Sequence, residues 1–159
     1  MSRQPHPRRT ASTQTPLTYA GTHDGPEPVV HPETETHWKR LGAGTLVLQR
    51  CGKCGLVRYP LAPVCWRCVS DDYEWVPVAT KGTVRVATIV TRGTGDPRWA
   101  QQTPYVVALV ELDDGPRIPG RVICPPTTNV SAGTRIELGY LTTPNGNGVH
   151  CFIPLEADS

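Results

Sequence analysis

The chain has 159 residues, a formal net charge of +2 and 38% hydrophobic residues, which suits one or two small domains with a modest core. The charge is too small for a typical nucleic-acid-binding domain, and no stretch approaches the roughly 18 apolar residues of a membrane span. The N-terminus has charged residues but lacks the apolar segment of a secretory signal. We therefore expect a cytoplasmic protein that does not contact a membrane.

Residues 1–32 are rich in Pro, Thr, Ser, Arg and His and show no apolar periodicity. Such a segment buries too little surface to offset the entropy that ordering would cost. We predict a disordered tail over 1–32.

A short helix is predicted next, because Pro32 is followed by acidic residues, a pattern typical of a helix start. Gly42 marks its end, and Trp38 and Leu41 share one face of the helix. That face either packs on the body of the same chain or helps to dock a partner. Together with the cysteine-rich segment that follows, this helix makes up the region 33–80.

The remaining residues alternate apolar and polar side chains in short, β-branched runs separated by Gly- and Pro-containing turns, which is the pattern of β-strands. In the cysteine-rich region, 45–50 and 74–78 have this pattern. In 81–159 the expected strands are 82–90, 105–112, 117–123, 133–138 and 149–153. Five strands in about 75 residues is the size of an OB-fold barrel. The fold class is therefore mainly β: a short helix, a zinc ribbon and a five-stranded OB-fold barrel.

Two Cys-x-x-Cys pairs, Cys51/Cys54 and Cys65/Cys68, are separated by ten residues. Each pair fits a tight turn, here called a knuckle, that presents two thiolates, and two knuckles complete a tetrahedral zinc site. All four ligands come from the protein, so we predict one structural zinc ion per chain. Val69 follows the second pair where a residue with positive φ is needed, and valine suits that conformation poorly. We therefore expect a distorted second knuckle.

Basic residues gather around the predicted zinc site. Residues 37–80 contain six Lys/Arg against three acidic residues, whereas 81–159 contain seven of each. Four of these basic residues, Arg50, Lys53, Arg58 and Arg67, could together bind the phosphates of a ligand. The alternative is that these side chains only offset the net charge of about −2 on a zinc tetrathiolate.

Several runs of the sequence, spread over residues 33–155, resemble a family of small zinc-ribbon plus OB-fold proteins long catalogued as a domain of unknown function. The runs that carry the resemblance are 38–55, 58–60, 63–65, 96–99, 104–117, 120–122, Gly133 and 151–154. The chain departs from the family pattern at Trp66 and Val69, where Pro and Gly are usual.

This resemblance implies a rubredoxin-like ribbon, an OB barrel and a non-catalytic role as accessory subunit of a thiolase-superfamily acyl-CoA enzyme. Relatives pair with thiolases, with aldolases that shorten sterol side chains, or with acyltransferases. It implies a hetero-oligomer, expected to hold two copies of each subunit, with acyl-CoA as a shared substrate. The resemblance thus makes Arg50, Lys53, Arg58 and Arg67 the candidates for binding the phosphates of coenzyme A. The candidate partner interface contains Trp38, Trp99 and Tyr105, because large aromatic side chains often anchor interfaces.

The residues themselves lack a complete catalytic set. Cys151 follows His150 in an alternating strand, so the two side chains point to opposite faces and cannot form a Cys–His pair. We therefore expect the isolated chain not to be an enzyme. The alternative function is a nucleic-acid-binding module, since both zinc ribbons and OB folds serve that role. Its weakness is strand 105–112, which has one aromatic residue and no Lys or Arg.

Overall fold

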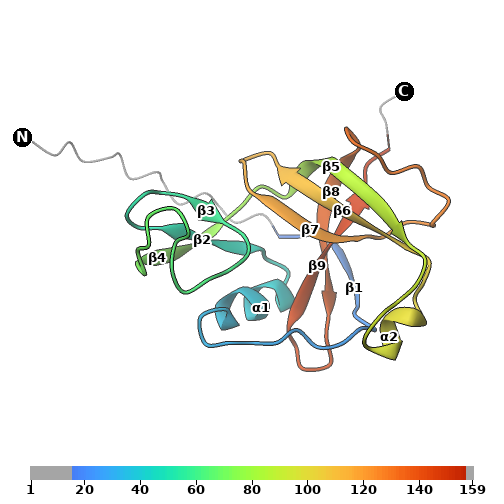
Figure 1. The fold of residues 1–159 in the computed structure, drawn as a ribbon, viewed down its shortest axis with the longest axis horizontal. Coiled ribbons are helices and arrows are strands. Elements are labelled where there is room, and N and C mark those ends of the chain that lie inside the picture. Colours follow the sequence, from blue (N-terminus) through green and yellow to red (C-terminus); the bar gives the residue numbers. More distant parts are fainter. Residues whose placement is uncertain (1–15, 157–159) are drawn as a thin grey trace, which may run out of the picture.

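The computed structural model describes residues 16–156 and consists of a small ribbon sheet, a closed barrel and a helix that contacts both (Figure 1). The elements in chain order are β1 (Tyr19–Thr22), α1 (Glu35–Gly42), β2 (Val47–Cys51), β3 (Val57–Arg58), β4 (Tyr73–Pro77), β5 (Lys81–Val90), α2 (Pro97–Ala100), β6 (Tyr105–Leu112), β7 (Arg117–Val122), β8 (Arg135–Thr142) and β9 (Gly148–Pro154).

Strands β5 to β9 form the barrel. Its strand order is β8-β5-β6-β7-β9, and the additional pairing of β9 with β8 closes it. β6 shows why these sequences fold this way, because every second side chain from Val106 to Leu112 is buried while those between are only half-buried. The core contains Val84, Val106, Val110, Leu112, Ile118, Val122, Ile136, Leu138 and Phe152, all at most 2% exposed. The predicted five-stranded OB-fold barrel is confirmed.

The predicted disorder of residues 1–32 is wrong for the part of this segment that the structure describes. β1 pairs in parallel with the second half of β8, with Tyr19 opposite Gly139 and Thr22 opposite Thr142. β5 covers only the first residues of β8, so β8 leaves an open edge that β1 fills. The pairing depends on that edge rather than on an apolar pattern in β1 itself, which is why composition did not reveal it. Residues 1–15 lie outside the described residues.

The ribbon sheet has the order β3-β2-β4 and is antiparallel. α1 packs against both this sheet and the barrel, with contacts to β2, β8 and β9. His37 and Leu41, one helical turn apart, form its fully buried face, and Trp38 beside them is half-buried. At the helix end, a Cβ on Gly42 would lie 2.1 Å from the carbonyl oxygen of Gly146. Glycine is therefore required where α1 meets the β8–β9 turn.

None of the described helices is both long and apolar enough to cross a membrane.

The buried His37 links stability to pH. Its Nδ1 lies 2.9 Å from the carbonyl oxygen of Val47, and burial lowers the pKa of His37 from its ordinary 6.5 to about 4. Between these values the unfolded chain binds a proton that the folded chain does not. The stability that this residue contributes is present above pH 6.5 and is lost as the pH falls toward 4.

We predict that replacing His37 with glutamine makes the free energy of unfolding less dependent on pH between 6.5 and 4. The loss in the unchanged protein over that range should be roughly 3 kcal/mol from this residue. Urea denaturation at a series of pH values measures it, with the exposed His31 replaced by glutamine as the control. Equal pH dependence in the His37→Gln variant and the unchanged protein would contradict the assignment.

Candidate metal centre and adjoining pocket

The four cysteines of the two pairs form one cluster. Their sulfur atoms all lie within 4.8 Å of one another, with 3.5 Å between Cys51 Sγ and Cys68 Sγ and 3.7 Å between Cys54 Sγ and Cys65 Sγ. Zinc–sulfur bonds of about 2.3 Å in a tetrahedron place sulfurs about 3.8 Å apart, so these distances suit one ion. A disulfide would bring two sulfurs to about 2.05 Å, and all four thiols are free.

Each of the two knuckles contains an equivalent backbone hydrogen bond. Gly55 N donates to Cys51 O at 2.9 Å, and Val69 N donates to Cys65 O at 2.8 Å. A hydrogen bond from the backbone N–H of Cys54 lowers the pKa of the Cys51 thiol, which favours the thiolate that zinc binds. Because the cluster supplies four protein ligands, the centre is suited to a structural rather than a catalytic zinc ion.

The second knuckle is not distorted, contrary to expectation. Val69 adopts φ 60°, and it is the one non-glycine residue with positive φ in the described part of the chain. Its counterpart Gly55 has φ 74°. The two turns therefore have the same backbone conformation, and Val69 accepts the strain that Gly55 avoids. Its side chain is 78% exposed, so no burial compensates for that strain.

Of the four basic residues near the zinc site, Arg58 is not on the surface. It is 1% exposed, its Nε donates to Gln49 Oε1 at 3.1 Å, and its guanidinium donates to Ala62 O at 2.9 Å. Ala62 N also donates to Gln49 Oε1, at 3.0 Å. The expectation that Arg58 belongs to an exposed coenzyme A patch is wrong, because this arginine instead fastens the loop 59–64 to β2.

The other three basic residues reach the surface. Arg50 forms an ion pair with Glu74, Lys53 is exposed, and the exposed Arg67 lies over the ring of Trp66 with 5.8 Å between its guanidinium carbon and the ring centroid. Contact of these side chains with coenzyme A stays a prediction.

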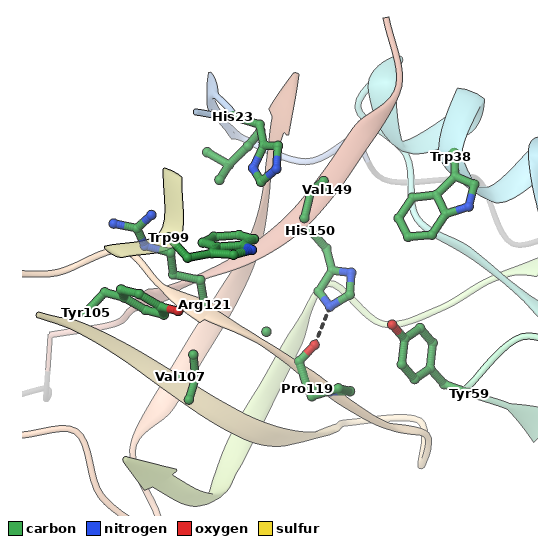
Figure 2. Close-up of a pocket in the computed structure, with 12 residues that line it drawn as sticks. His23, Trp38, Tyr59, Trp99, Tyr105, Val107, Pro119, Arg121, Val149 and His150 are labelled. Carbon is green, nitrogen blue, oxygen red and sulfur yellow. Dashed lines mark hydrogen bonds between the residues drawn. The ribbon is translucent and has the colours of Figure 1, made fainter. Parts of the chain in front are cut away.

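The three expected interface residues line one pocket (Figure 2). Trp99 from α2 and Tyr105 from β6 are neighbours, with ring centroids 6.1 Å apart. Trp38 from α1 lies on the opposite side of the pocket, where its Nε1 donates to Thr34 Oγ1 at 3.2 Å. The structure thus brings the three residues of the expected interface, from α1, α2 and β6, to the same pocket.

Sequence reasoning missed other residues of this pocket: His23, Tyr59, Arg121 and His150. His23 belongs to the segment expected to be disordered, and Tyr59 comes from the ribbon. Neither has a local motif that marks it. Their contribution depends on the packing of the ribbon and the N-terminal segment against the barrel.

Comparison with known families is consistent with both modules. Residues 38–74 match the family described as the rubredoxin-like zinc ribbon domain of ChsH2, and residues 75–140 match the C-terminal OB-fold domain of ChsH2.

Similar proteins include a "DUF35 domain-containing scaffold protein" of Methanocaldococcus jannaschii, 31% identical over 58% of this chain and 64% of that protein. A "Probable enoyl-CoA hydratase alpha subunit" of Thermomonospora curvata is 32% identical over 73% of this chain and 35% of that protein. The chain thus spans about a third of the hydratase subunit. Among solved structures, a chain of an "Ltp2-ChsH2(DUF35) aldolase" matches with TM-score 0.68 and 28% identity, covering 80% of this chain and 98% of that chain.

We predict about one zinc ion per chain by elemental analysis, and loss of that zinc in the Cys65→Ala variant. Removing one ligand from a centre whose metal contributes on the order of 10 kcal/mol should unfold the ribbon. The control is Cys124→Ala, because Cys124 is a free thiol outside the cluster and its loss should leave the zinc content unchanged. A folded ribbon without metal, seen by NMR, would refute the structural role.

We also predict that Val69→Gly raises the free energy of unfolding by about 0.5–1 kcal/mol, because glycine adopts positive φ without strain. The reciprocal change, Gly55→Val, should lower it by about 1–2 kcal/mol. Nothing lies within 4 Å of a Cβ at Gly55, so backbone strain alone is tested there. Urea denaturation of the zinc-loaded proteins measures both, and a destabilised Val69→Gly variant would show that the valine side chain contributes more than the strain costs.

Proposed function

Because the chain belongs to the DUF35/ChsH2 family of zinc-ribbon plus OB-fold proteins, we propose that it is a non-catalytic scaffold subunit of a thiolase-superfamily enzyme that acts on acyl-CoA. The observation that carries the proposal is the match to 98% of the ChsH2(DUF35) chain in a solved aldolase. The name of the hydratase relative, which contains a similar region, supports acyl-CoA as the substrate class.

The chemistry of the described cysteines outside the zinc cluster supports a non-catalytic role. Burial raises the pKa of the Cys151 thiol to about 12, and burial also raises the pKa of Cys124. Both thiols are protonated at neutral pH, and a protonated thiol is a poor nucleophile. We therefore assign the nucleophile and the base to the partner, while this chain stabilises the partner and shapes the entrance for acyl-CoA.

The surface that we propose for the partner surrounds the pocket of Trp38, Trp99 and Tyr105. These rings are only half-buried in the chain, and they come from α1, α2 and β6. Half-buried aromatic rings at a concave site are favoured interface anchors, since they bury a large area and have few rotamers to fix. Two copies of this subunit would bind around the two-fold axis of a dimeric enzyme.

Coenzyme A would lie toward the ribbon, where Lys53 and Arg67 are exposed. Their positive charges can pair with the phosphates of coenzyme A. Arg50 already forms an ion pair with Glu74 at 40% side-chain exposure, so it would add less.

We predict that this chain co-elutes with its thiolase-fold partner in size-exclusion chromatography and that the partner loses activity without it. Trp99→Ala should weaken the complex by about 2 kcal/mol. Ile89→Ala is the control, because Ile89 is an exposed apolar side chain on β5, outside the pocket, and its loss should leave the complex unchanged.

A partner that is fully active alone and elutes separately would contradict the scaffold role. Binding of single-stranded DNA tighter than roughly micromolar, weakening steeply with salt, would instead support the nucleic-acid-binding alternative.

A further inference from the structure

Segments that are far apart in the sequence, from His23 to His150, line the pocket beside α2. Its volume is about 340 Å³, within the range of small-molecule sites, roughly 300–1,000 Å³. Aromatic rings supply much of its wall, and Val107, Leu141 and Val149 supply aliphatic surface. The ring-bearing residues are Trp38, Tyr59, Trp99 and Tyr105. Such walls favour an apolar ring, because aromatic pairs stack or meet edge to face.

His150 presents a hydrogen-bond acceptor without a partner. It is 5% exposed, and its Nε2 lies 2.6 Å from the carbonyl oxygen of Pro119. A carbonyl oxygen only accepts, so Nε2 carries the hydrogen. Burial lowers the pKa of His150, so the ring is neutral and Nδ1 keeps a free lone pair. Nδ1 is buried and has no hydrogen-bond partner in the described structure, which makes it a position for a ligand that donates a hydrogen.

Tyr59 supplies the complementary donor. Its ring meets that of His150 edge to face, with 6.0 Å between centroids, and its hydroxyl points toward His150 (Figure 2). Burial raises the pKa of Tyr59, so the hydroxyl keeps its hydrogen at neutral pH. A ligand hydroxyl could therefore donate to His150 and accept from Tyr59. This pair of roles suits a hydroxyl group, which both donates and accepts.

The centre of the pocket has no charged group. Arg121 is the one Arg, Lys, Asp or Glu among the lining residues. Its guanidinium donates to Gln102 and stacks on Tyr105, 5.1 Å from the ring centroid. In Figure 2 that guanidinium lies on the far side of Trp99 from His150. Gly120 lines the pocket beside His150, and a Cβ there would lie 2.8 Å from the Phe152 ring and 3.1 Å from the His150 ring. A neutral ligand is therefore favoured.

We propose that this pocket binds a small neutral ring compound that carries a hydroxyl group, a phenol or a cyclic alcohol, with the hydroxyl between His150 Nδ1 and Tyr59 Oη. The site is built from this chain alone and does not rest on the scaffold role.

The test is an NMR titration of the zinc-loaded full chain, labelled with ¹⁵N at tryptophan, with phenol, anisole and toluene. All three probes share a ring, but only phenol can donate a hydrogen. We expect phenol to shift the indole signals of Trp38 and Trp99 and to leave those of Trp66 and Trp75 in place, because these two lie outside the pocket. A solvent molecule can satisfy the same lone pair, so the ratio of affinities is the decisive quantity. Phenol should bind about tenfold more tightly than anisole or toluene.

Tyr59→Phe removes one hydroxyl and keeps the ring. It should weaken phenol binding about fivefold and leave toluene binding unchanged, while Tyr73→Phe, in the ribbon and outside the pocket, should change neither. The proposal is overturned if phenol and anisole bind equally, if the Trp38 and Trp99 signals do not move, or if all four indole signals move together. Because no partner enzyme is present, failure here leaves the scaffold role standing, and failure of complex formation leaves this site standing.

Discussion

The ribbon sheet depends on its four thiolates, because it buries few side chains of its own. Val47, Leu48, Gln49 and Arg58 are buried there beside Cys51 and Cys65, and two of these are polar. A sheet of three short strands with so small an interior is marginal in water. A metal ion at the four-cysteine cluster would take the place of the missing core, since binding energy at such a centre is folding energy. The turn at the second cysteine pair keeps its conformation even though Val69 must adopt a positive φ.

A metal ion at the four-cysteine cluster would also help to position one wall of the pocket. Holding the knuckles in place holds β2, and the buried Gln49 on β2 fastens the loop 59–64 through Arg58 and Ala62. Tyr59 stands at the start of that loop and faces His150 on the barrel. The four-cysteine cluster thus helps to position one wall of the pocket, although none of the cysteines lines the pocket. Losing zinc would remove a wall of the pocket while the barrel behind it remained.

Local patterns were enough to predict the barrel strands and the clustering of the four cysteines. A strand with one buried face requires alternating side chains, and this alternation is visible from Tyr105 to Leu112. A four-thiolate site requires two closely spaced pairs, which are visible as Cys51/Cys54 and Cys65/Cys68. Position in three dimensions was not predictable in that way. Arginine is usually found at the surface, so the sequence did not indicate that Arg58 is buried. Its role is clear only from its burial and its hydrogen bond to Gln49. The pocket likewise joins residues of α1, α2, the ribbon and β9, so no single stretch of sequence contains its pattern.

The placement of β1 has a practical meaning for anyone who shortens this protein. Both family-matched regions lie between residues 38 and 140, so a chain that starts at residue 33 would seem complete. It would nevertheless uncover the backbone N–H and C=O groups of Gly139–Thr142 that β1 now pairs. An unpaired sheet edge is a template for strands of other molecules. Trimming would therefore leave a barrel that is prone to strand exchange and aggregation.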